Sequence, residues 1–253
     1  MYRLIAVYSA VALSALLAPF AALVYYGYGP FFSNVAFGEG LLRSIGVTLL
    51  ASSAAVLINI AFFTPVAFYA ARRRNAVINA LTDIPASVPH PIVGIALVLL
   101  ASPQTAVGRF LNSLGVSLFD SYIGLVAALV IVSAPVYIRS AQSYFEALPR
   151  EPELMAVSMG AGEARVFWYV FRGSARGLLS SGLTAMSRAI SEFGAVAIIA
   201  YYVSGPPFGL ASPASVYIWN SFETYYLSAI PEAATLLLFS LAVLAAAHAL
   251  RSR

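Results

Sequence analysis

Two charged residues lie four positions apart inside a largely apolar stretch of the sequence. Arg188 and Glu192 fall within the run from Leu178 to Val203. Residues four apart share one face of a helix, so the guanidinium and the carboxylate could neutralise each other. A charge at the centre of a membrane span costs at least about 2.5–3.5 kcal/mol on insertion scales, and such a residue usually faces the protein interior or a water-filled path.

Two interpretations of this polar face remain open. In the first, Arg188 and Glu192 form a structural pair with each other or with a neighbouring helix. In the second, the face lines a path through the membrane on which Arg188 helps an anion to cross. The residues of that path are Thr184, Arg188, Ser191 and Glu192. Because Glu192 would oppose an anion, the second interpretation predicts weak, transient binding.

Other reactive side chains are scarce. The chain has no cysteine, and all 14 basic residues are arginine, so disulfides, thiolate chemistry and a P-loop lysine are excluded. The two histidines, His90 and His248, have no metal-ligand spacing. We expect no catalytic residue, no metal and no ATP-binding motif in this chain, and we interpret His90 as structural.

The composition indicates an integral membrane protein. Of the 253 residues 61% are hydrophobic and 9% are charged, whereas soluble domains carry about 25% charged residues. A bilayer core of about 30 Å needs about 20 helical residues. Six runs qualify, which predicts an all-α membrane protein with one domain over residues 1–253. The runs are 4–26, 41–71, 84–101, 122–138 (or on to 145), 178–203 and 230–250.

Prolines modify the third run, since Pro85, Pro89 and Pro91 lie at its start and the regular helix should begin near Pro91. We also expect Asp83 to pair with the cluster Arg72–Arg74. Asn59, inside the second run, should hydrogen-bond across helices.

The arginines predict the orientation. With the N-terminus in the cytoplasm, eleven arginines face inward and two, Arg43 and Arg109, face outward, which is a strong positive-inside bias. Both chain ends and the segment 144–177 are then cytoplasmic. The inward arginines are Arg3, Arg72, Arg73, Arg74, Arg139, Arg150, Arg165, Arg172, Arg176, Arg251 and Arg253.

The pattern of apolar residues in the segment 144–177 predicts two short amphipathic helices. Pro149 and Pro152 end the preceding span, and Gly160 and Gly162 suit a tight turn between the two helices. The segment could be a docking site for another protein or a plain interfacial loop, and its spacing alone does not decide between them.

The same segment resembles the cytoplasmic E-A-A-x-x-x-G-x9-I-x-L-P loop of ABC importer permeases. With Gly160 at the family glycine, Ala156 matches the second alanine and Val170 the isoleucine, while the family Glu and Pro are absent. The run Ser187-Arg-Ala-Ile-Ser-Glu-Phe-Gly-Ala195 resembles Ala-Arg-Ala-Leu-Gly-Glu-Phe-Gly-Ala of molybdate, tungstate and sulfate permeases. Ala147–Glu151 and Asp83–Gly94 also resemble that group.

The resemblance implies a type I ABC importer permease fold, in the cell (inner) membrane, with a coupling helix between the fourth and fifth helices. It implies a homodimer on two ABC ATPase subunits, which bind ATP and Mg, and an external oxyanion-binding protein. No cofactor is expected on this chain and no nucleic acid as partner. The ATPase-coupling loop would include Glu153, Ala156, Met159, Gly160, Ala161, Gly162 and Arg165.

The function implied is import of a tetrahedral oxyanion, molybdate or tungstate first, by a subunit that is not itself an enzyme. A sulfate or thiosulfate permease is the close alternative. A stand-alone secondary transporter and a membrane-embedded enzyme are the other classes, and the isolated histidines and single intramembrane carboxylate disfavour the enzyme. No regulatory domain is expected after Arg253.

Overall fold

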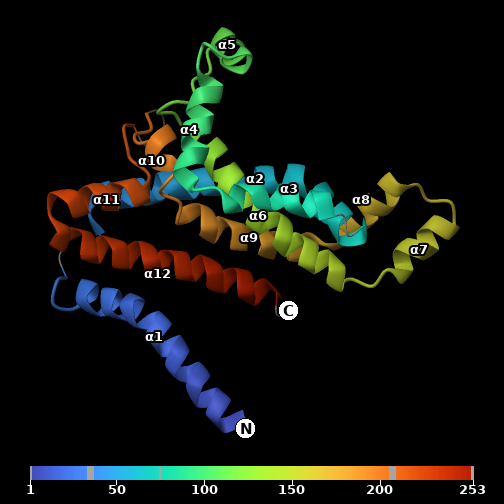
Figure 1. The fold of residues 1–253 in the computed structure, drawn as a ribbon, viewed down its shortest axis with the longest axis horizontal. Coiled ribbons are helices and arrows are strands. Elements are labelled where there is room, and N and C mark those ends of the chain that lie inside the picture. Colours follow the sequence, from blue (N-terminus) through green and yellow to red (C-terminus); the bar gives the residue numbers. More distant parts are fainter. Residues whose placement is uncertain (1, 33–36, 74–75, 205–208, 252–253) are drawn as a thin grey trace.

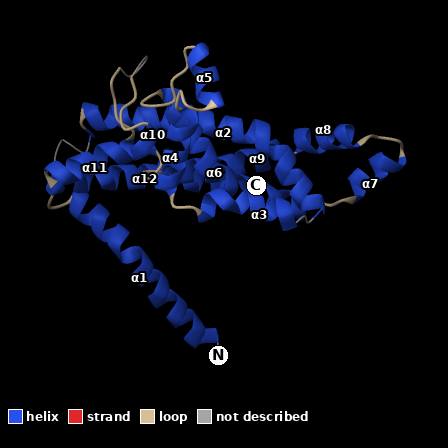
Figure 2. Cartoon of the chain, turned by 45° about the horizontal axis from the view of Figure 1, so that its top comes forward, coloured by secondary structure: helices blue, strands red, loops and turns tan. Residues whose placement is uncertain are grey.

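The computed structural model describes residues 2–32, 37–73, 76–204 and 209–251, which are mainly helical (Figure 1, Figure 2). Within them, Val203 and Ala211 form an isolated β-bridge and no strand occurs, so the predicted all-α class is confirmed. Arg74 and Arg253 of the orientation argument lie outside the described residues. The helices are α1 (Tyr2–Tyr28), α2 (Glu39–Arg73), α3 (Ala76–Ser87), α4 (His90–Ala101), α5 (Ala106–Ser113), α6 (Tyr122–Ala147), α7 (Glu151–Ser158), α8 (Glu163–Gly173), α9 (Ala175–Ile190), α10 (Val196–Ile199), α11 (Ala214–Thr224) and α12 (Tyr226–Arg251).

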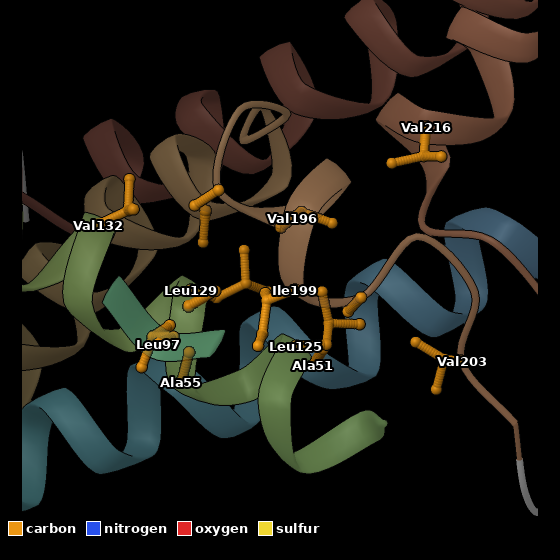
Figure 3. Close-up of a cluster of buried hydrophobic side chains, with 14 of the residues drawn as sticks. Ala51, Ala55, Leu97, Leu125, Leu129, Val132, Val196, Ile199, Val203 and Val216 are labelled. Atoms are coloured by element: carbon orange, nitrogen blue, oxygen red, sulfur yellow. The ribbon is translucent and has the colours of Figure 1, made fainter. Parts of the chain in front are cut away.

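Three helices form the centre of the molecule. α2 packs along α6, and α9 packs against both, with α12 on the other side of α9. The largest cluster of buried side chains joins α2, α4, α6 and α10 (Figure 3). Ala51 and Ala55 of α2 lie in this cluster beside Leu129 of α6 and Ile199 of α10. Small residues on α2 let the larger side chains of the neighbouring helices approach closely.

Polar side chains also join the two longest central helices. The amide Nδ2 of Asn59 donates to the hydroxyl of Ser133 at 2.8 Å, and both residues are fully buried. One turn further along α2, the hydroxyls of Thr64 and Tyr137 lie 2.5 Å apart. The predicted hydrogen bond of Asn59 across helices is therefore confirmed.

The count of membrane spans differs from the six expected. Among the described residues, α1, α2, α6 and α12 are long and apolar enough to cross a membrane. α3 and α4 would make a fifth span as a pair, bent by 97°. None of the apolar window of α1 is buried inside the chain, so that helix offers its surface to lipid or to another protein.

The third and fifth predicted spans are not single helices. The run 84–101 is divided between α3 and α4 because Pro89 lacks a backbone donor and disfavours helical geometry at Val88 before it, while Pro91 is tolerated in the first turn of α4. The regular helix begins at His90, close to the predicted Pro91. The run 178–203 is helical only to Ile190, the end of α9, and α10 follows after a turn. At 16 residues α9 is shorter than a full span.

The predicted partner of Asp83 was wrong. Asp83 on α3 pairs with Arg139 on α6, with 2.5 Å between Oδ2 and Nη2. Arg72 pairs instead with Glu153 of α7. α3 folds back along α6, which brings residues 56 positions apart together. The arginine on the facing helix therefore replaces the arginines that are close in sequence.

Because α4 approaches α10 closely at Gly94, we predict that a larger residue there lowers the stability of the protein. A Cβ atom built there would lie 2.6 Å from the carbonyl oxygen of Ala195 and 2.9 Å from Cβ of Ile198. Gly94→Ala should therefore destabilise the protein by about 1–3 kcal/mol, the usual effect of overpacking. Unfolding in mixed micelles measures it, with Gly173→Ala as the control because nothing lies within 4 Å of that Cβ. Equal stability of the two variants would contradict the close packing.

Candidate functional site

The first candidate site, named here the break site, consists of His90, Arg188 and Glu192 where α9 ends. Glu192 lies in the turn between α9 and α10, and its side chain is 1% exposed. Its Oε1 accepts a hydrogen bond from the backbone N–H of Ala195 at 2.9 Å. Its own carbonyl accepts from the hydroxyl of Ser215 on α11 at 2.6 Å. The carboxylate thus satisfies a backbone group that the interrupted helix leaves unpaired.

The side chains of Arg188 and His90 both contact the second oxygen of this carboxylate, Oε2. Nη2 of Arg188 lies 2.9 Å from Oε2 of Glu192, and Nδ1 of His90 lies 3.0 Å from the same oxygen. Nη2 of Arg188 is also 3.1 Å from Nε2 of His90. The same Nη2 is closer still to Nδ1 of His90, at 2.7 Å, so the tautomer of His90 decides which ring nitrogen accepts from Arg188.

Exposure separates the members of the break site. The side chains of Arg188 and His90 are each 28% exposed, whereas Glu192 is almost completely covered. A solute on the open side would therefore meet the guanidinium and imidazole before the carboxylate. The planar guanidinium presents several N–H donors, which suits the oxygens of an oxyanion.

The other two residues predicted on this face lie on the same side of α9 as Arg188. The hydroxyl of Ser191 is 3.4 Å from Nη1 of Arg188. Thr184 lines a groove of about 480 Å³ together with Arg139, Ser140 and Ser143 of α6. Arg188, Ser191 and Glu192 therefore lie in mutual contact, whereas Thr184 lies in the neighbouring groove.

Sequence reasoning missed the contact of His90 with this pair. The histidine is 98 residues from Arg188, and its position between two prolines suggested only a structural role. The close approach is visible at Gly194, where a Cβ would lie 2.9 Å from Cδ of Pro91. Two prolines next to a histidine, and a glycine beside the intramembrane pair, were the signals available.

The second candidate site is the segment formed by α7, the turn after it and α8, which projects at one end of the molecule (Figure 1). The N–H of Gly160 bonds to the carbonyl of Val157, and the N–H of Ala161 to that of Ala156, both at 2.9 Å. This is a Schellman motif, which needs a left-handed residue, and Gly160 supplies it with φ +88°. The predicted tight turn between two short helices is confirmed.

A buried ion pair fixes this segment to the central helices. Nη2 of Arg72, on the last turn of α2, lies 2.5 Å from Oε1 of Glu153, and both side chains are largely covered. Nη1 of the same arginine donates to the carbonyl of Phe145 at 2.5 Å. Arg150 reaches back from the start of α7 to the carbonyl of Ala71 at 3.2 Å. α7 is therefore connected firmly to the cytoplasmic ends expected for α2 and α6.

The outer surface of α7 is apolar and uncovered. α7 has no buried residue, and four of its large apolar side chains, or those just after it, are more than half exposed. These residues are Leu154, Met155, Val157 and Met159. On α8, Arg165 lines a groove of about 930 Å³ with Trp168 and Tyr169. Exposed apolar surface of this kind marks a site for another protein or a membrane.

The described residues contain no group of three His, Asp or Glu side chains that could hold a metal ion.

Comparisons with known proteins agree with each other. The family of "Binding-protein-dependent transport system inner membrane component" matches residues 63–253. The molybdate/tungstate transport system permease protein of Pyrococcus abyssi is 32% identical over 193 residues, which cover 75% of this chain and 69% of that protein. The protein of that description from Thermococcus kodakarensis is 34% identical over 193 residues, with 75% and 70% covered. A sulfate transport system permease protein of Synechocystis sp. is 32% identical over 209 residues, with 80% and 71% covered.

The burial of the break site predicts that its two charged residues differ in how much stability is lost when each is replaced. Arg188→Gln leaves a covered carboxylate without its guanidinium, whereas Glu192→Gln leaves an arginine that can reach water and keeps an acceptor for Ala195. Arg188→Gln should therefore be the more destabilising single change. The double variant should be more stable than the sum of the singles by about 0.5–3 kcal/mol, the range for groups in one network.

Unfolding in mixed micelles measures this cycle. Arg109→Gln serves as the control, because that exposed guanidinium on α5 donates to the backbone carbonyl of Gln104. Additive effects of the two single changes would show that the pair is not coupled.

Proposed function

This chain belongs to the family of binding-protein-dependent transport system inner membrane components and is a permease subunit of an ABC transporter. We propose that it forms the membrane pathway for a tetrahedral oxyanion. Molybdate and tungstate are the leading candidates, since two of the similar proteins carry those ions in their names. The chain is a multi-pass membrane protein, with four or five helices apolar enough to span among the residues described.

The observation that carries the proposal is the partly exposed guanidinium of Arg188 beside the break that follows α9. A dianion that leaves water needs N–H donors and positive charge, and Arg188 offers both from a membrane segment. Glu192, at 2.9 Å, neutralises much of that charge. The site would hold an oxyanion weakly, which suits a pathway whose affinity resides in an external binding protein.

We propose that the path includes Thr184, Arg188 and Ser191, with Glu192 as the partner that keeps Arg188 in place. The groove at Thr184 extends the polar surface toward Arg139 of α6. An ion released by Arg188 would then meet a second arginine, itself paired with Asp83. Paired arginines can exchange a carboxylate for a passing oxyanion without the formation of a deep binding site.

The α7–α8 segment is the proposed seat for the ATPase subunits. Its coupling residues are Glu153, Ala156, Met159, Gly160, Ala161, Gly162 and Arg165. The apolar side chains of α7 are exposed and would be covered by a partner. The ion pair of Glu153 with Arg72 connects this seat to α2, so a displacement of α7 would move a central helix.

The proposed assembly has two ATPase subunits, which bind ATP and Mg, a second copy of this chain and an external oxyanion-binding protein. This chain itself binds no cofactor. The orientation in the cell membrane follows from the arginines, and Arg72, Arg139 and Arg150 lie toward the α7–α8 end. Both chain ends would be cytoplasmic.

Sulfate is the second candidate ion. A similar protein carries sulfate in its name, and sulfate has the charge and tetrahedral shape of molybdate. The break site offers hydrogen-bond donors to any such dianion, so its geometry does not favour one of them.

Reconstitution tests the function directly. The chain, co-purified with its ATPase subunit and placed in liposomes, should hydrolyse ATP faster when its binding protein is added with molybdate or tungstate. Addition of the binding protein with sulfate is the matched comparison and identifies the ion. Ion flux from the chain alone, without ATP, would overturn the importer and indicate a secondary transporter.

A variant at the turn tests the coupling seat separately. Gly160→Val places a branched side chain at φ +88°, which strains the Schellman turn although open space surrounds it. We expect ATP hydrolysis that no longer drives uptake, with the thermal midpoint of the membrane helices unchanged. Gly173→Val is the control, because that position is helical and also open. Normal coupled uptake by Gly160→Val would remove α7–α8 from the coupling mechanism.

A further inference from the structure

A pocket lined by residues of α2, α11 and α12 lies at the end of the molecule opposite α7 and α8, as the positions of these helices in Figure 1 show. It has a volume of about 640 Å³ and is bounded by the start of α2, by α11 and by the start of α12. Its lining includes the hydroxyl groups of Ser44, Ser221, Tyr217 and Ser228. The proposed path and the coupling seat use none of these residues.

Glu232 of α12 is the unusual member of this lining. It is 1% exposed, and its Oε2 has no hydrogen-bond partner among the residues that the structure describes. Ser221 of α11 lines the same pocket as the carboxyl group. A buried carboxylate oxygen without a partner costs more than a lost hydrogen bond, because the ion has also given up its water.

The charged side chains around the pocket sum to one unbalanced negative charge. Arg43 is the one cationic side chain among the described residues that line it. Its Nη2 is already 2.6 Å from Oε1 of Glu39, on the exposed surface of α2. With that pair neutral, the carboxylate of Glu232 remains uncompensated.

A proton or a cation would each neutralise this carboxylate, and the pocket supplies further oxygens that only a cation could use. Burial, helped by the negative charge of Glu232, raises the pKa of the Tyr217 hydroxyl, so this group stays a neutral oxygen. A proton on Oε2 would make a donor that also lacks a partner. A cation instead takes lone pairs from several oxygens at once, and hard cations prefer carboxylate, hydroxyl and water oxygens.

We propose that this pocket binds one monovalent hard cation of the Na⁺ class, coordinated by Oε2 of Glu232 and by hydroxyl oxygens of α2 and α11. A single carboxylate supplies one negative charge, which matches a monovalent ion better than a divalent one. The pocket is far larger than a bare ion, so water would complete the coordination on the open side. The ion would join three helices at the end where the orientation proposed above places the outside of the cell.

The test is cation-dependent stability of the full-length protein in detergent. The thermal midpoint is measured while Na⁺ replaces choline at constant ionic strength, because choline is too large to be coordinated. A saturable rise of roughly 2–5 °C is expected for a bound ion in a protein of this size. Glu232→Gln should lose the rise, and Glu223→Gln, an exposed change on the neighbouring helix, should retain it.

Two results would overturn the proposal. One is an equal rise in Glu232→Gln and in the unchanged protein. The other is no response to Na⁺ together with a rise at lower pH that requires Glu232, which would identify a protonated carboxyl. Should Glu232→Gln fail to fold, Ser221→Ala keeps the charge and removes a neighbouring oxygen, and direct binding of radioactive ²²Na⁺ to the unchanged protein should reach one ion per chain. None of these readouts requires transport, so their failure is distinct from failure of the importer.

Discussion

The covered carboxylate of Glu192 holds together the part of the chain on which the rest of the arrangement depends. It accepts the N–H of Ala195, which keeps α10 at a fixed angle to α9, and it pairs with Arg188. His90 of α4 and Ser215 of α11 contact the same residue. A membrane offers no water to an interrupted helix, so a break of this kind persists only where side chains and neighbouring helices satisfy the freed groups. The Arg188–Glu192 ion pair, which is unusual in so apolar a stretch of sequence, is thus a structural requirement of the fold.

A stiff connection links the two ends of the molecule. α2 runs for 35 residues, from Glu39 beside the cation pocket to Arg73 beside α7. At its first end it contributes Ser44 to the pocket, and at its last turn Arg72 holds Glu153. Because α2 also packs along α6 over most of its length, the two ends belong to one packed unit. Ligands at either end therefore act on the same central helices.

Local signals in the sequence were sufficient for features decided within a few residues. The turn at Gly160 follows from its need for positive φ, and the Arg188–Glu192 pair follows from helical spacing. Contacts between distant residues were not predictable in this way. Several arginines are close to Asp83 in the sequence, and its partner becomes Arg139 only because α3 folds back along α6. His90 was missed for the same reason, and the break in α9 is visible only once the carboxylate that stabilises it is seen to face inward.

The packing of α1 has a consequence for the order in which the chain assembles during synthesis. α1 ends at Tyr28 and packs mainly against α12, which begins at Tyr226, with Tyr28 and Thr235 joined by a 2.9 Å hydrogen bond. At about 5–20 residues per second, the ribosome needs roughly 10–40 s to make the chain between them. α1 is made before α12 and must therefore remain in the bilayer without this partner for that time. Its long apolar window, none of which is buried inside the described part of the chain, is what allows it to persist there as an independent segment.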